Sequence, residues 1–208
     1  MLNRRLASLI AAVSVAGLAA TGCAEQSAAV RVDDATVSRS DFEDQLDIVY
    51  ENDDLRAFLF QAVDRSQLRA EGDPSGSFRQ EYVGAMATLQ VQFLVAAQAL
   101  ENEGLELTDD DRAGVIDQLD QGVPDGFESL PQGFRDDLVD GIAAFDKLQS
   151  ELGEEGFTVA VGEVVDAADI EVSSRYGSWD PDQFTVTPPP GPAPAPGAGD
   201  DETGLTPG

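Results

Sequence analysis

Apolar side chains recur at helical spacing through most of the segment from residue 29 to residue 181. The spacing predicts helices over residues 40–51, 54–65, 78–103, 108–122 and 132–152. The longest, 78–103, carries apolar residues on more than one face, so we expect it to be the central helix of the domain. The 132–152 helix instead has a single apolar stripe, made by Phe134, Leu138, Ile142, Phe145, Leu148 and Leu152.

Helix boundaries are marked by residues that satisfy the free backbone groups of a helix end. Three pairs have the spacing of a capping box, in which a side chain at each position accepts a backbone N–H. These pairs are Ser40 with Glu43, Ser77 with Gln80, and Thr108 with Asp111. Gly104 is expected to end the long helix, since glycine readily adopts the left-handed conformation of a helix C-terminus.

Strand patterns flank the helices. A hairpin is predicted from strand patterns at Val30–Val32 and Thr36–Val37, with an expected turn at Asp33-Asp34. A further short strand is expected over Phe157–Val161. Residues 170–176 alternate between apolar and polar side chains, which predicts another strand. A two-stranded ribbon is marginal alone, so we expect the strands at the two ends of the domain to pair. The predicted fold class is α+β, mainly α, with one helical domain and a small sheet.

The N-terminus has the pattern of an export signal. Arg4 and Arg5 precede an uncharged run from Leu6 to Ala20, which at about 1.5 Å per helical residue is short for a bilayer of about 30 Å. A transmembrane span is therefore the weaker interpretation. Residues Ala20-Thr21-Gly22-Cys23 then resemble the lipobox of bacterial lipoproteins, with Ala20 where that motif usually has Leu; Cys23 is the single cysteine of the chain. We expect residues 1–22 to be removed, Cys23 to carry a lipid and residues 23–28 to form a tether; the alternative is a buried core cysteine.

The chain after residue 181 changes composition. Proline, glycine and acidic residues dominate, with little to bury after Val186 except Leu205. We therefore predict a disordered tail over residues 182–208.

Charge and composition exclude several functions. From Cys23 onward the chain has 10 basic and 40 acidic residues, a net charge of −30, which opposes binding to nucleic acid or anionic lipid head groups. The chain has no histidine, which removes Ser-His-Asp and Cys-His nucleophiles and the commonest zinc ligand.

Two further polar groups have both a chemical and a structural interpretation. Lys147 and Ser150 have the spacing of a Ser-Lys pair, but the polar surface of a helix explains them better. Asp109–Asp111 suggest calcium, but acids also favour a first helical turn, and no Asp-x-Asp-x-Asp-Gly loop is present. We assign no catalytic residue, metal ligand or cofactor.

Three segments resemble a known family. Residues 32–42, Val-Asp-Asp-Ala-Thr-Val-Ser-Arg-Ser-Asp-Phe, resemble the opening hairpin and first helix of the SurA-like N-terminal domain of envelope foldases. Residues 96–111, with Gly104-Leu105-Glu106-Leu107-Thr108-Asp109, are similar to the family's helix-to-helix junction. Residues 175–180, Arg-Tyr-Gly-Ser-Trp-Asp, look like the closing strand of actinobacterial lipoproteins of this kind. Together these resemblances cover about residues 29–181, which suggests one SurA-like domain over that range.

The resemblance implies a chaperone that binds unfolded or nascent exported proteins. Many relatives add a parvulin-type isomerase domain of about 90 residues with histidines in its active site, and neither feature is found here, so we do not expect an enzyme. The surplus apolar residues Val91, Leu94 and Val95 are candidate client contacts, with a plain core role as the alternative.

Arg175, Tyr176 and Trp179 form a candidate partner patch. The alternative is structural, with the two aromatic rings over the helices and Arg175 paired to an acid. For the whole protein, the second function class is a structural or assembly lipoprotein of the envelope with one dedicated protein partner.

Overall fold

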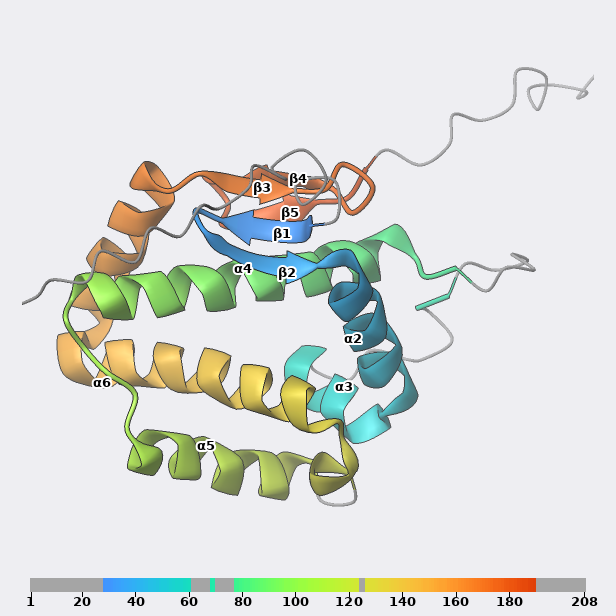
Figure 1. Ribbon diagram of the computed structural model, residues 1–208, viewed down its shortest axis with the longest axis horizontal. Helices are drawn as coiled ribbons and strands as arrows, with labels where there is room; N and C mark the ends of the chain where they lie inside the picture. Colours follow the sequence, from blue (N-terminus) through green and yellow to red (C-terminus); the bar gives the residue numbers. More distant parts are fainter. Residues whose placement is uncertain (1–27, 61–67, 70–76, 124–125, 190–208) are drawn as a thin grey trace, which may run out of the picture.

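The computed structural model describes residues 28–60, 68–69, 77–123 and 126–189. Cys23, the signal segment 1–22, most of the predicted tether and the tail from residue 190 lie outside these ranges, as do residues 61–65 of one predicted helix. Within them the chain is α+β and mainly helical (Figure 1).

A small sheet is formed from both ends of the fold. Strands β1 (Ala28–Val32) and β2 (Ala35–Ser38) form the predicted hairpin, and β3 (Ile170–Val172) pairs antiparallel with β1. The sheet order is β2-β1-β3, which confirms that the terminal strands pair. Asp33 makes the hairpin turn with φ 49° and accepts hydrogen bonds from Gln98 and from the backbone N–H of Asp169. The turn thereby joins the hairpin to the long helix and to the start of β3.

The helices form layers beneath the sheet. Figure 1 shows α4 (Gln80–Asn102) below the strands, α6 (Gln132–Ala167) on the other side of α4, and α5 (Asp109–Gly122) beyond α6. The shorter helices α2 (Arg39–Glu51) and α3 (Asp53–Phe60) close one end. The predicted central position of the long helix is confirmed, because α4 contacts both the sheet and α6.

Two predicted capping boxes are wrong and one is confirmed. The N-cap of α2 is Ser38, two residues before the predicted Ser40, and the Ser38 hydroxyl accepts the Asp41 N–H at 3.2 Å; Ser38 is extended because it also ends β2. Helix α4 begins at Gln80 with Arg79 at its N-cap, so Ser77 lies outside the first turn. Thr108 and Asp111 form the capping box of α5 in both directions.

The strand predicted at Phe157–Val161 is wrong, because α6 continues through it. Gly153 has φ 70° and ψ 178°, which kinks the helix, and the chain then turns past the end of α4 toward β3 (Figure 1). After the kink, Ala160, Val161 and Val164 are buried while Val159 is 55% exposed. This burial has helical spacing rather than the alternation of a strand.

The domain boundary predicted at residue 181 falls too early. Strand β4 (Ser178–Asp180) pairs with β5 (Thr185–Thr187), and Val186 of β5 is buried against α4. The Val186 N–H donates to Thr88 Oγ1 at 2.8 Å. Residues 182–187 therefore belong to the folded domain and not to the tail. The short 3-10 helix η2 (Phe127–Ser129) connects α5 to α6.

Candidate functional site

A groove with an apolar floor runs between the long helix and its neighbours. It has a volume of about 510 Å³ and is bounded by α4, α6, strand β2 and the connection from α4 to α5. Its apolar lining comes from Val37, Phe93, Leu94, Ala97, Leu100, Leu105, Leu107 and Ala144. Phe93 and Leu94 are only half-buried, so their side chains leave apolar surface within the groove. The groove is therefore a concave site of the size and character that can bind apolar side chains.

The floor of the groove is set by the close approach of α4 and α6. A side chain at Gly141 of α6 would overlap the ring of Phe93, so glycine lets this ring lie directly against the helix. Phe93 also packs edge-on against Phe145, with ring centroids 6.4 Å apart. These contacts hold the Phe93 ring in the floor.

One wall of the groove is the connection between α4 and α5, residues 103–108. Gly104 has φ 67°, the Leu105 N–H donates to the Leu100 carbonyl at 2.9 Å, and the Gly104 N–H donates to the Glu101 carbonyl. These bonds form a Schellman motif, and the predicted end of α4 at Gly104 is confirmed. The motif turns Leu105 back to the face of α4 that holds Leu100.

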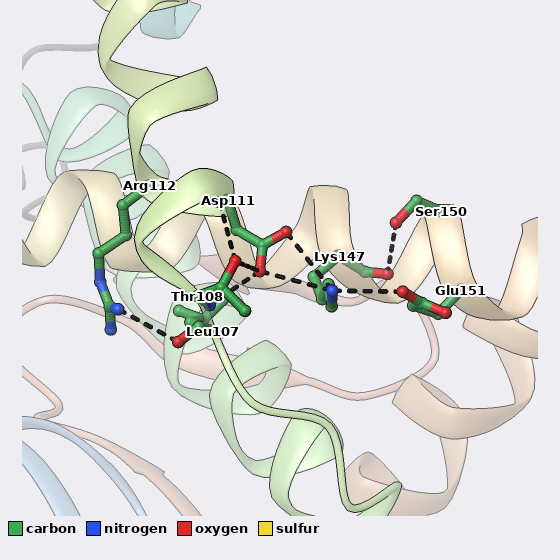
Figure 2. Close-up of polar contacts among 7 residues, drawn as sticks. All are labelled: Leu107, Thr108, Asp111, Arg112, Lys147, Ser150 and Glu151. Atoms are coloured by element: carbon green, nitrogen blue, oxygen red, sulfur yellow. Dashed lines mark hydrogen bonds and ion pairs between the residues drawn. The ribbon is translucent and has the colours of Figure 1, made fainter.

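The other end of this wall is fixed to α6 by polar contacts (Figure 2). Asp111, held in the capping box by Thr108, lies 3.5 Å from the Nζ of Lys147, and Lys147 also pairs with Glu151 at 3.2 Å. Hydrogen bonds from Thr108 are the main cause of the lowered pKa of Asp111. The hydrogen bond to Glu151 is the main cause of the raised pKa of Lys147. Both groups are thus charged at neutral pH and link α5 to α6.

The rim of the groove is acidic. Glu101, Glu106, Asp137 and Asp140 lie along it, with Arg112 as the cation of the described lining. Arg112 Nε donates to Asp140 Oδ1 at 2.6 Å, and this bond is the main cause of the raised pKa of Arg112. The pKa of Asp137 is also raised, first by burial and then by the charges of Asp136, Asp140 and Asp41. The rim therefore carries more negative than positive charge.

The structure separates the three predicted client contacts. Leu94 lines the groove, but Val91 and Val95 are completely buried, so the prediction that they contact clients is wrong and the core interpretation is confirmed for them. Their positions on α4 face the interior because this helix is covered on two sides. Leu105 and Leu107 line the groove but were not predicted as site residues. Their alternation around Glu106, just before the Thr108 cap, was the available signal.

The candidate partner patch is also divided. Tyr176 is buried, with its ring 4.6 Å from that of Phe42, and its hydroxyl donates to Glu43 at 3.0 Å. Burial, with the hydrogen bond to Glu43 and its charge, raises the pKa of Tyr176 to about 12. Tyr176 is a core residue, and the prediction that it belongs to a partner surface is wrong.

The other two members of the patch differ in exposure. Arg175 pairs with Glu43 at 3.3 Å, as the structural interpretation predicts, and its side chain remains exposed. Trp179 packs edge-on against Phe184 and forms part of a hollow of about 730 Å³ beside β1 and β3, lined by both polar and apolar residues. Arg175 also lies over the Tyr176 ring, 5.7 Å from its centroid, whereas Trp179 has Phe184 as its aromatic neighbour.

The remaining chemical candidates have structural roles. Ser150 Oγ donates to the backbone carbonyl of Lys147 at 3.0 Å, whereas Lys147 Nζ points to Asp111 and Glu151 (Figure 2). The Ser150 hydroxyl therefore does not contact the Lys147 ammonium. Asp111 acts as a cap. Across the described ranges, no three side chains among His, Cys, Asp and Glu are grouped to hold a metal ion.

Helix α4 is long and apolar enough to cross a membrane by length and composition. Within this fold it is the helix between the sheet and α6, with more than half of its most apolar stretch buried. A soluble core helix passes the same test, so this property does not indicate a span.

The comparisons with known proteins add no assignment. No family model matches the chain, and no significant match is found among curated proteins or solved structures. The function must therefore be argued from the groove itself.

Proposed function

We propose that this protein is a lipid-anchored, extracytoplasmic binding protein that holds unfolded exported polypeptides without catalysis. The observation that carries the proposal is the groove, which has a volume of about 510 Å³ and in which half-buried Phe93 and Leu94 offer apolar surface. Apolar burial contributes about 25 cal/mol per Å² and is indifferent to the order of residues in a client. Such a site suits weak binding to many sequences.

Strand β2 supports an extended client. It lies at the edge of the sheet, where β1 is its neighbour, and its Thr36 and Val37 also line the groove. A free strand edge presents backbone donors and acceptors that an extended peptide can pair with, independently of its side chains. A client in the groove would thus bind through its main chain to β2 and through apolar side chains to α4.

The proposed anchor is a lipid on Cys23. The first described residue, Ala28, is five residues later, so the intervening chain spans at most about 18 Å when fully extended. The domain would stay close to the outer face of the membrane, where exported chains emerge. Replacing Cys23 by Ser should release the protein from the membrane fraction and lower its mass by the acyl groups; unchanged partitioning and mass would overturn the anchor.

Suppression of client aggregation tests the binding role. The chain from Cys23 onward retains every described element, since the fold begins at Ala28. This chain, with Cys23→Ser, is mixed in several-fold excess with a chemically unfolded exported protein, and light scattering is followed. We expect lower scattering, and no suppression would contradict the proposal.

A matched pair of variants assigns the activity to the groove. Ala97→Glu places a charge on an exposed groove position, whereas Ala113→Glu makes the same change on the exposed face of α5, away from the groove lining. Suppression should fall with Ala97→Glu and persist with Ala113→Glu. Equal effects would remove the groove from the proposal. Capture of one stoichiometric protein in place of many clients would instead favour an assembly lipoprotein with a dedicated partner.

A further inference from the structure

We propose that the groove selects extended segments in which Lys or Arg flanks the apolar residues. This inference rests on the function proposed above and names its client class. The observation behind it is the negative charge at the rim of the groove. Apolar burial alone does not distinguish one apolar segment from another, whereas these charges favour segments that carry cations.

The rim has an excess of three carboxylates. Arg112 is committed to Asp140 by the 2.6 Å contact of its Nε and to the Leu107 carbonyl at 3.2 Å. In the described part of the chain, no ion pair engages Glu101, Glu106 or Asp137. Glu101 and Glu106 lie at the end of α4 and in the connection, whereas Asp137 lies on α6, so negative charge borders the groove on two sides.

An occupant must compensate these charges. A bound segment displaces water from the rim, and removal of water from an unpaired carboxylate is unfavourable. Asp137 already shows part of this cost, since partial loss of water and neighbouring acids raise its pKa although the residue still reaches solvent. A Lys or Arg on the segment replaces the lost hydration by ionic contacts and places its own aliphatic stem on the apolar floor. A segment flanked by Asp or Glu would add repulsion.

The extended geometry makes the pattern achievable. Side chains alternate between the two faces of a strand, at about 3.3 Å per residue. If the main chain pairs with β2, apolar residues can face Phe93 and Leu94 while residues at the flanks reach the rim. The preferred client is therefore a short apolar stretch with cations at its ends.

Three labelled peptides provide the test. They share an extended apolar centre and carry two Lys, two Ser or two Glu at each end, and their binding to the chain from Cys23 onward with Cys23→Ser is measured by fluorescence anisotropy. We expect the Lys peptide to bind at least about fivefold more tightly than the Ser peptide, and the Glu peptide more weakly than either. The advantage should shrink as salt is raised, because exposed charges are screened over about 10 Å at 0.1 M.

Neutralising the rim tests its role directly. In the variant with Glu101→Gln, Glu106→Gln and Asp137→Asn, the Lys peptide should lose its advantage while the Ser peptide binds as before. A control with Asp117→Asn, Asp120→Asn and Glu128→Gln removes the same charge from exposed positions outside the groove lining. This control should retain the preference. Circular dichroism reports folding of both variants, and the salt titration of the unmodified sequence tests the preference even if one variant fails to fold.

Each result separates the two proposals. Equal binding of the Lys and Ser peptides, both weakened by Ala97→Glu, would overturn the charge selection and leave the binding function standing. A preference that survives neutralisation of the rim would assign it to the net charge of the molecule and overturn this inference. If none of the three peptides binds, both proposals fail.

Discussion

At the scale of single residues, the cap of α5 shows how local chemistry positions the groove. The Thr108 hydroxyl accepts the Asp111 N–H at 3.2 Å, and the Asp111 carboxylate accepts the Thr108 N–H at 2.8 Å. The same carboxylate faces Lys147 of α6. One short motif therefore begins a helix and fixes the groove wall to its neighbour.

Thr108→Ala tests this cap. The change removes the hydroxyl acceptor from the first turn, so the free energy of unfolding should fall by about 1 kcal/mol. Urea denaturation measures the loss. Thr108→Ser keeps the hydroxyl and should retain most of the stability; an equal loss in both variants would show that the threonine methyl, and not the cap, matters.

Asp137 provides a prediction of pH dependence. Its pKa in the folded protein is raised above the ordinary value of 3.8, so the folded state binds its proton more tightly than the unfolded state does. The charged carboxylate therefore destabilises the fold at neutral pH, and this penalty is relieved as the pH falls through the raised pKa toward 3.8. Asp137→Asn should be more stable than the unmodified protein at pH 7, with the difference shrinking near pH 4.

Denaturation curves at both pH values provide the measurement. Because the chain has a large negative charge, loss of any acid can stabilise it. Asp120→Asn, on the exposed face of α5, serves as the control for this general effect. An equal gain from Asp120→Asn at pH 7 would show that the environment of Asp137 is not responsible.

At the scale of elements, the kink at Gly153 decides the path of the chain. Its φ of 70° and ψ of 178° are unfavourable for residues with a side chain, although a Cβ would meet no atom there. The backbone conformation, and not crowding, therefore requires glycine. The kink redirects the second part of α6 toward β3 and so allows the terminal strands to pair.

Gly153→Ala should lower the free energy of unfolding by about 1–3 kcal/mol, the usual cost of a strained backbone conformation. Gly162→Ala is the matched change after the kink, where a Cβ also has open space. It should raise stability by about 0.5–1 kcal/mol, because alanine is the better helix former. Thermal unfolding compares the two, and equal effects would contradict a special role for Gly153.

Sequence patterns predicted most helices and strands, but not that α6 continues through residues 157–161. The spacing of apolar residues defined α4 and α5, and the strand pattern defined the hairpin, because these elements each bury a regular set of positions. Phe157, Val159 and Val161 also alternate, which suggested a strand. The burial of Ala160 and Val164 shows helical packing, and short apolar runs fit both patterns.

The candidate site was less predictable than the fold. The sequence shows that Leu94 is an apolar residue outside the main apolar stripe of α4. Its partial exposure, and the burial of Val91 and Val95, depend on where β2 and α6 lie. The acidic rim joins residues of α4, of the connection and of α6, which are adjacent only after folding. Contacts between distant segments of this kind leave no local periodicity in a sequence.

At the scale of the whole molecule, the C-terminal strand completes the body of the domain. Val186 is 3% exposed, and Thr88 of α4 accepts the Val186 N–H and lies 3.2 Å from the Thr185 hydroxyl. Gly84 of α4 also leaves room for Pro188, 3.1 Å from the position that its Cβ would take. The N-terminal half of α4 is thus covered by β5, the last strand among the described residues.

Truncation distinguishes this strand from the tail. A chain ending at Pro181 loses β5 and exposes the surface of α4 beneath it. Its free energy of unfolding should therefore be lower by at least about 2 kcal/mol, the value expected for one buried valine. A chain ending at Pro189 keeps β5 and should match the full chain in urea denaturation. Equal stability of the two truncated chains would show that β5 contributes nothing to the fold. Because the groove lies on α4 nearer its C-terminal end, peptide binding by the shorter chain should decline only as far as the fold itself is lost.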